Sequence, residues 1–185
     1  MSTMKYLKSQ TWEVHTRLEK RLAIKDRFSD IVSYREHLSR ILAFHQAAET
    51  EWAFWLERAL GDFPARRKVP SLLRDLDDVG GSPIGIAEVP SVIDIPSALG
   101  AFYVLEGATL GGQHLLPMAE AKLGLSAENG ASYLNSYGSD VRTMWTAFGA
   151  AVEAQCHTDD ARDMAAISAR STFLAMEAWL CGDQS

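Results

Sequence analysis

The chain has 185 residues, which is enough for one domain with a full hydrophobic core. Hydrophobic residues make up 47% of the sequence and charged residues 23%, as is typical of a globular protein. The formal net charge of −6 argues against a nucleic-acid partner, and the sequence has no run of about 18 apolar residues that would span a membrane.

The compartment is predicted from the N-terminus and the cysteines. The first residues, MSTMKYLKSQ, lack the apolar core of a signal peptide. The two cysteines, Cys156 and Cys181, provide neither a disulfide framework nor a spacing suited to a metal. We therefore expect the protein to work in the reducing cytoplasm.

Helix signals begin near the N-terminus. Between residues 5 and 24 one face with the period of an α-helix is made by Leu7, Thr11, Val14, His15, Leu18 and Leu22. The next helix is predicted to begin at Ser33, where SYRE has the form of a capping box, and to run to Gly61. Ser71 is expected to cap a short helix that Gly80 closes.

The second half of the chain follows the same pattern. Residues 81–96 contain three prolines and are predicted to be a connector. Ser97 would cap a long helix that ends at Gly124 and bends near Pro117. Two further helices are expected over 140–155 and 159–180, the last capped by Thr158 and ended by Gly182. No segment shows convincing strand alternation, so we predict an all-α multi-helix bundle that forms a single domain over residues 1–185.

Three glycines interrupt the apolar run YVLEGATLGGQHLL, residues 103–116. Each glycine in a helix interior costs about 1 kcal/mol relative to alanine, so these glycines require a reason. On a helical wheel they belong to a face of almost bare backbone, made by Gly100, Val104, Gly107, Ala108, Gly111, Gly112 and Leu115. Such a face could serve either close helix–helix packing or the close approach of a flat ligand to the backbone.

A histidine lies within the apolar stripe of the first helix. His15 is followed one turn later by Glu19, a spacing that places imidazole and carboxylate on one side of the helix. A histidine that binds a metal through one nitrogen commonly donates its other N–H to such a carboxylate. One histidine cannot hold a bare metal ion, but it can ligate an iron that a porphyrin already holds. A histidine that only packs in the core could show the same spacing. When His15 and Glu19 are considered together with the face of almost bare backbone on the later helix, however, they indicate a slot for haem.

Two segments give a specific family resemblance. YVLEGATLGGQ resembles the distal-helix signature of the haem (heme) oxygenases, and TWEVHTRLE resembles the proximal segment that carries their iron-ligating histidine. RRKVPSLLRDLDDVG and MWTAFGAAVE are similar to further segments of the bacterial branch, particularly the oxygenases associated with bacteriophytochromes. The resemblance covers residues 8–179 and implies a fold in which haem lies between a proximal helix and a kinked distal helix.

The resemblance assigns the two faces of the haem. It implies that His15 is the axial ligand of the iron and that Glu19 orients it. Gly107, Gly111 and Gly112 would form the distal wall, beside which dioxygen and water bind.

The resemblance has one departure on the distal side. Animal-type members place an aspartate after the first of these glycines, where this chain has Ala108. We therefore expect protons to be delivered by the backbone, by Thr109 or by a polar group of another segment.

The haem edge and the pocket wall are assigned in the same way. The family pattern implies that Lys8 binds a haem propionate, with Arg142, Arg170 and the Tyr103 hydroxyl as further candidates. Phe173 and Met176 would line the pocket. The remaining histidines are interpreted as ordinary structural residues: His37, His45, His114 and His157.

In this family haem b is both substrate and cofactor and is held noncovalently. The implied reaction uses O2 and electrons from an external donor to open the ring at a meso carbon, giving biliverdin, CO and Fe2+. A ferredoxin, a flavodoxin-type protein or a flavin reductase would supply the electrons. The product would serve a bacteriophytochrome as its bilin chromophore, or the reaction would release iron.

Three alternatives stay open at this stage. A non-catalytic haem carrier or sensor of the same fold is motivated by Ala108. A di-iron carboxylate bundle would need Glu-x-x-His pairs on two helices, which the sequence lacks. A thiaminase-like enzyme would need a nucleophilic cysteine, and neither cysteine has a convincing base nearby in the sequence.

Overall fold

The computed structural model describes residues 1–182, so the last three residues of the expected domain, 183–185, lie outside the described residues. Within residues 1–182 the chain is helical and has no β-strand beyond isolated bridges at Ser126, which confirms the all-α prediction. No helix in this range has both the length and the apolar character that a membrane crossing requires.

The helices follow one another with short connections, except for the connector after the fifth. Their bounds are α1 (Thr3–Leu22), α2 (Ile31–Glu51), α3 (Ala53–Ala59), α4 (Phe63–Arg66), α5 (Val69–Asp78), α6 (Ile95–Leu123), α7 (Ser132–Asn135), α8 (Val141–Gln155) and α9 (Asp159–Cys181). Two 3₁₀ helices, η1 (Ile24–Phe28) and η2 (Gly138–Asp140), lie before α2 and α8.

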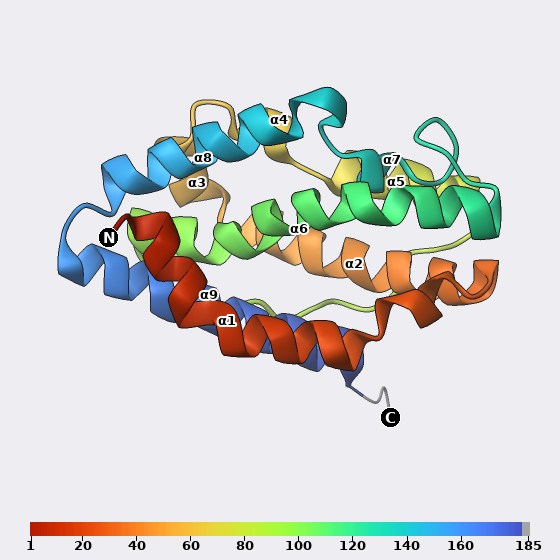
Figure 1. Cartoon of the computed structure of the whole chain (residues 1–185), viewed down its shortest axis with the longest axis horizontal. Helices are drawn as coiled ribbons and strands as arrows, with labels where there is room; N and C mark the ends of the chain where they lie inside the picture. Colours follow the sequence, from red (N-terminus) through yellow and green to blue (C-terminus); the bar gives the residue numbers. More distant parts are fainter. Residues whose placement is uncertain (183–185) are drawn as a thin grey trace.

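Helix α6 is the central element and runs along the length of the molecule (Figure 1). Helix α9 packs against both α6 and α1, and these are the two most extensive helix contacts. Helix α8 contacts α6 from the other side, so α1 and α9 form one edge of the view in Figure 1 and α8 forms the opposite edge. The buried rings of Phe63, Phe102 and Phe148 join α4, α6 and α8, with centroids 5.7 and 6.0 Å apart along the row.

Several helix ends agree with the sequence. The hydroxyl of Thr158 accepts a hydrogen bond from the Ala161 amide and so caps α9. Gly124 closes α6 with a left-handed φ of 67°, a conformation that glycine adopts without steric penalty. Pro117 lies inside α6 without ending it.

The predicted start of α2 was wrong by three residues. Asp30, not Ser33, is the N-cap: its Oδ1 accepts hydrogen bonds from the Val32 and Ser33 amides, both at 2.9 Å. One carboxylate oxygen thus satisfies two free amides of the first turn, which the shorter serine hydroxyl three residues later does not do. The helix also does not continue to Gly61, because α2 ends before Trp52 and α3 begins after it.

Two other predicted caps were displaced for related reasons. Ser97 is the third residue of α6, and it forms a reciprocal capping box with Asp94, the true N-cap. Helix α5 begins at Val69 and not after Ser71, because Oε1 of Glu49 accepts hydrogen bonds from the Lys68 and Val69 amides at 2.6 and 3.1 Å. This cap comes from another helix; the local signal for the start of α5 was Pro70 in its first turn.

The glycines on the bare face of α6 serve two different functions. A Cβ on Gly100 would overlap the backbone carbonyl of Ala165 in α9, and a Cβ on Gly112 would lie 2.8 Å from the carbonyl oxygen of Leu134. Around Gly107 the nearest atom would be 4.0 Å away, and around Gly111 nothing lies within 4 Å. Gly100 and Gly112 therefore serve packing, whereas Gly107 and Gly111 leave open space.

This division predicts opposite effects of one added methyl group. Gly100→Ala should lower the free energy of unfolding by about 1–3 kcal/mol, because α6 and α9 must move apart. Gly111→Ala should leave it unchanged or raise it by up to about 1 kcal/mol, because alanine favours the helix and the site has room. Urea unfolding of the ligand-free protein measures both; equal destabilisation by the two changes would contradict the division.

Candidate functional site

A cavity of about 620 Å³ lies between α1, α6 and α9. Helix α1 supplies His15 to its wall, α6 supplies Gly107 and Gly111, and α9 supplies Phe173 and Met176. The predicted axial ligand and two of the three predicted distal glycines thus line the same cavity. Its volume falls in the range of about 300–1,000 Å³ usual for sites that enclose a small molecule or cofactor.

The imidazole of His15 is held as the sequence predicted. Its Nε2 lies 3.3 Å from Oε1 of Glu19, and its ring lies against Phe173 with centroids 5.2 Å apart. The His15 side chain retains 44% of its exposure, so the ring remains accessible from the cavity. Nε2 is the ring nitrogen that faces the carboxylate.

Along α6 the cavity wall is bare backbone at Gly107 and Gly111 and carries a methyl group at Ala108, with the side chain of Leu110 between them. Two predicted catalytic residues do not reach this wall. Gly112 faces Leu134, as described above. Thr109 is buried on the opposite side of α6, where its hydroxyl donates to the carbonyl of Glu106 at 2.6 Å. Two residues along a helix turn by about 200°, which directs the Thr109 side chain away from the cavity that Gly107 lines.

The four candidates for anion binding separate into two groups. Lys8 and Tyr103 line the cavity, and burial raises the pKa of the Tyr103 phenol, which stays neutral and able to donate. Arg142 lies on the exposed side of α8. The guanidinium of Arg170 donates to the Gln10 carbonyl of α1 at 2.8 Å, so the arginine ties α9 to α1 and does not line the cavity.

Two histidines that the sequence analysis treated as structural also line the cavity. His37 of α2 is half-buried, and burial, together with the charges of Arg27 and Arg40, lowers its pKa to about 4. His114 of α6 is exposed at the cavity. Ile41, one turn after His37, also lines the cavity. A spacing of four residues places both side chains on one face of α2, and this spacing was the signal in the sequence that they face the same space.

His45 is buried, and it has partners that the sequence analysis missed. Its Nε2 lies 3.3 Å from the hydroxyl of Tyr133, and Tyr133 lines the cavity. Its Nδ1 lies 3.4 Å from Oε1 of Glu49. The sequence held a signal for this pair, because His45 and Glu49 repeat the His-x-x-x-Glu spacing of His15 and Glu19.

A buried charge network holds α6 beside the cavity. Oε2 of Glu106, the residue before Gly107, accepts a 2.6 Å hydrogen bond from Nη1 of Arg66, and its Oε1 accepts another of 2.6 Å from the Tyr137 hydroxyl. The Glu106 and Arg66 side chains are each only 1% exposed. Burial raises the pKa of Glu106, against the hydrogen bond from Tyr137 and the charge of Arg66. Because Arg66 also donates to the Met144 carbonyl at 3.2 Å, the network joins α4, α6 and α8.

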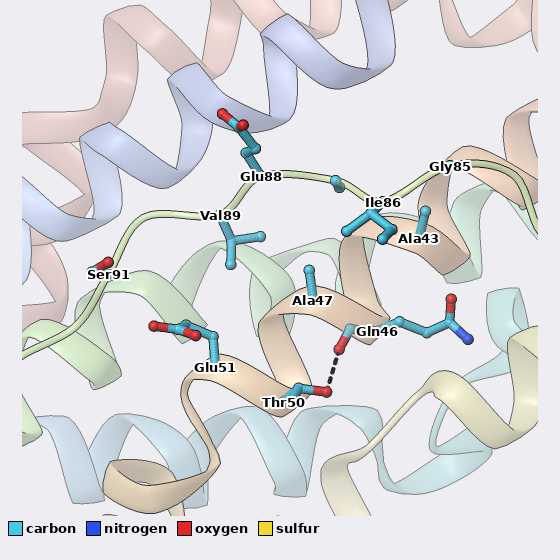
Figure 2. A pocket seen from close by; sticks show the side chains of 11 residues that line it. Ala43, Gln46, Ala47, Thr50, Glu51, Gly85, Ile86, Glu88, Val89 and Ser91 are labelled. Carbon is cyan, nitrogen blue, oxygen red and sulfur yellow. Dashed lines mark hydrogen bonds between the residues drawn. The ribbon is translucent and has the colours of Figure 1, made fainter.

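A second hollow, of about 600 Å³, lies between α2 and the connector that follows α5 (Figure 2). Its wall is formed by small, aliphatic and polar residues such as Ala47, Thr50 and Ile86, together with Glu51 and Glu88. Among the residues described, this wall has no histidine, lysine or arginine. The cavity beside His15 is therefore the better candidate for a site that binds an anionic, iron-containing ligand.

The buried network predicts a large difference between two adjacent arginines. Arg66→Gln should lower the free energy of unfolding by about 3–5 kcal/mol, because it leaves the carboxylate of Glu106 buried without its charged partner. Arg67→Gln, the matched control, removes an exposed pair with Glu57 and should cost less than about 1 kcal/mol. Urea unfolding measures both, and similar losses would show that the network does not stabilise the fold.

Comparison with known proteins agrees with this geometry. The family model described as heme oxygenase matches residues 1–181. The NO- and CO-bound heme oxygenase from Neisseria meningitidis has a structure that superposes with a TM-score of 0.86 at 26% identity, covering 97% of this chain and 90% of its own.

Two more distant structures share the fold. A heme oxygenase from Leptospira interrogans superposes with a TM-score of 0.78 at 21% identity, covering 98% of this chain and 99% of its own. Heme oxygenase 2 from Chlamydomonas reinhardtii, crystallised without heme, gives a TM-score of 0.80 at 14% identity, covering 97% of this chain and 96% of its own. None of the curated proteins matches. Since the family model spans nearly the whole chain, this protein belongs to the haem oxygenase family.

Proposed function

We propose that this protein binds haem b between α1 and α6 and cleaves it with O2 and external electrons to biliverdin, CO and Fe2+. The observation that carries the proposal is that His15, with its carboxylate partner, lines the same cavity as the bare backbone at Gly107 and Gly111. Family membership supports the same reaction.

On the α1 side, His15 would ligate the haem iron through the ring nitrogen that does not face Glu19. The carboxylate would fix the orientation of the imidazole and make it a better donor to the metal. Phe173 and Met176, both almost fully buried, would contact the apolar part of the porphyrin beside this histidine.

On the α6 side, the chain would contribute space and backbone groups in place of side chains. The haem substrate supplies both the carbon that is oxidised and the iron at which O2 is reduced. With no acid or cation projecting from Gly107, Ala108 or Gly111, the α6 wall leaves room for O2 and water between helix and ring. Lys8 and Tyr103 would bind the haem propionates by charge and by hydrogen bonding.

The partners of the reaction are proposed from its chemistry. A ferredoxin, a flavodoxin-type protein or a flavin reductase would deliver the electrons, and the bilin would pass to a bacteriophytochrome or the iron would be recovered. Cys156 and Cys181 are both free thiols, which supports a reducing, cytoplasmic location.

A haem carrier or sensor of the same fold is the second candidate. It is favoured by one observation: the residue after Gly107 is Ala108, whose methyl group lies on the cavity wall and offers no proton donor. The two candidates bind the same ligand and differ only in its fate.

Reconstitution with haemin separates the two functions. An oxygenase should take up one haemin per chain and, with reductant and air, lose the haem absorption while a biliverdin band and free CO appear. A ferrous complex that is stable in air, without a bilin product, would establish the carrier. Failure to bind haemin in a 1:1 ratio would exclude both.

The axial ligand is tested by replacing His15. His15→Ala should abolish the native axial ligation and change the optical and EPR spectra of the haemin complex, because the cavity wall loses the imidazole nearest Glu19. Glu19→Gln should keep the ligation but lower affinity or turnover by roughly 10–100-fold. His157→Ala is the control, since that exposed imidazole faces the Ala154 carbonyl at the end of α8. Unchanged spectra in His15→Ala would assign the iron to another residue.

A further inference from the structure

A row of three polar side chains leads away from the cavity wall. The Tyr133 hydroxyl lies 3.3 Å from Nε2 of His45, and Nδ1 of His45 lies 3.4 Å from Oε1 of Glu49. His45 is 3% exposed and Glu49 is 8% exposed. Although Nδ1 of His45 is within ion-pair distance of Glu49, it has no aligned hydrogen-bond partner. A buried ring nitrogen without a partner is unusual and needs an explanation.

The row connects two separate spaces. Tyr133 lines the cavity that also contains His15. Glu49 lines a different hollow of about 390 Å³, together with Gln46, Thr50 and Arg67. Because Thr50 and Arg67 are exposed, this hollow lies at the protein surface. His45 is the link between the two spaces.

We propose that Glu49, His45 and Tyr133 form a proton relay from this surface hollow into the cavity. The relay rests on the proposed function, because reduction of O2 at the haem consumes protons and the α6 wall carries no acid. It would supply the polar group of another segment that the sequence analysis expected but did not identify.

In each transfer one proton enters the relay at the surface hollow and one proton leaves it into the cavity, and no electrons move. His45 accepts at Nδ1 a proton that has arrived from the surface hollow on the carboxyl group of Glu49, and the Glu49 carboxylate left behind stabilises the resulting imidazolium. The proton on Nε2 then passes to the oxygen of Tyr133 as the hydroxyl proton of Tyr133 leaves toward the cavity. The imidazole returns to its starting tautomer by proton exchange before the next transfer.

The environment of each group suits its step. Oε1 of Glu49 already accepts hydrogen bonds from the Lys68 and Val69 amides, which fix the carboxylate beside His45. Oxygen atoms of Asp75 accept from the Ser132 and Tyr133 amides, which fix the short helix that carries the phenol. Burial and the charge of Glu49 raise the pKa of Tyr133, so the phenol keeps its proton until one arrives from His45.

His37, which also lines the cavity, is less suited to this role. Burial and the charges of Arg27 and Arg40 lower its pKa to about 4. A neutral imidazole of this kind does not store a proton at neutral pH. The His45–Glu49 pair has the opposite electrostatic arrangement.

The test uses the full chain loaded with haemin. Tyr133→Phe and Glu49→Gln should bind haemin with unchanged stoichiometry but slow single-turnover haem cleavage by about tenfold or more. This is less than the ~10²–10⁴-fold usual for positioned proton donors, because water also enters the cavity. The solvent deuterium isotope effect on cleavage should change in the same two variants.

Two control variants remove matched groups elsewhere. Tyr34→Phe deletes another buried phenol hydroxyl, which donates to the Gly130 carbonyl at 2.8 Å. Glu153→Gln alters another carboxylate that accepts two amide hydrogen bonds at a helix start, from Thr3 and Met4. Both should cleave haem at the rate of the unchanged protein.

A measurement on the haem-free protein adds a readout that does not depend on turnover. In ¹⁵N NMR of labelled histidines, Tyr133→Phe should shift the Nε2 signal of His45, and Glu49→Gln should shift its Nδ1 signal. Wild-type cleavage rate and isotope effect in Tyr133→Phe would overturn the relay while leaving the oxygenase function intact. If the unchanged protein binds haem but forms no bilin, the proposed function and the relay both fail.

Discussion

The cavity depends on how the contacts of α6 change along its length. At Gly100 its backbone touches the backbone of α9, and about two turns later, at Gly107 and Gly111, nothing fills the space beside it. Two helices that meet so closely at one end and stay apart at the other enclose a wedge, and α1 closes that wedge with His15. A side chain at Gly100 would separate the helices, and a large one at Gly111 would fill the space, so the same residue type is needed at both places for opposite reasons.

The helical fold was predictable because its signals are local. The apolar period of α1, the left-handed Gly124 and the Thr158 cap are each contained in a few consecutive residues. The cap of α5 was not predictable in this way, because its carboxylate belongs to Glu49 of another helix, although Pro70 in the first turn marks where the helix starts. The start of α2 could have been predicted, since Asp30 is as favourable a capping residue as Ser33 and lies only three positions before it.

The site was predictable only in part, for a similar reason. His15, Glu19 and the glycines follow from spacing on single helices, together with the family resemblance. A helical wheel alone cannot tell that Gly112 packs on Leu134 while Gly111 is open, because that depends on where α7 lies. Arg170 was predicted to bind a haem propionate because of its charge, but its guanidinium instead donates a hydrogen bond to the Gln10 carbonyl of α1. The Tyr133–His45 contact joins residues 88 positions apart and becomes visible only in the folded chain.

The position of Glu106 explains why protons would need to come from another wall. It is the carboxylate nearest in sequence to Gly107, but it does not line the cavity; it is paired with Arg66 and accepts a hydrogen bond from Tyr137. Its charge therefore holds α6 in place and does not act on the ligand. The α2 residues His37, Ile41, His45 and Glu49 recur every fourth position. Such a row turns by about 40° at each step, and it runs from the cavity at His37 and Ile41 to the surface hollow that Glu49 lines. In the proposed relay only the last two of these residues, His45 and Glu49, would pass protons to Tyr133 of α7, while α6 keeps its backbone bare beside the ligand.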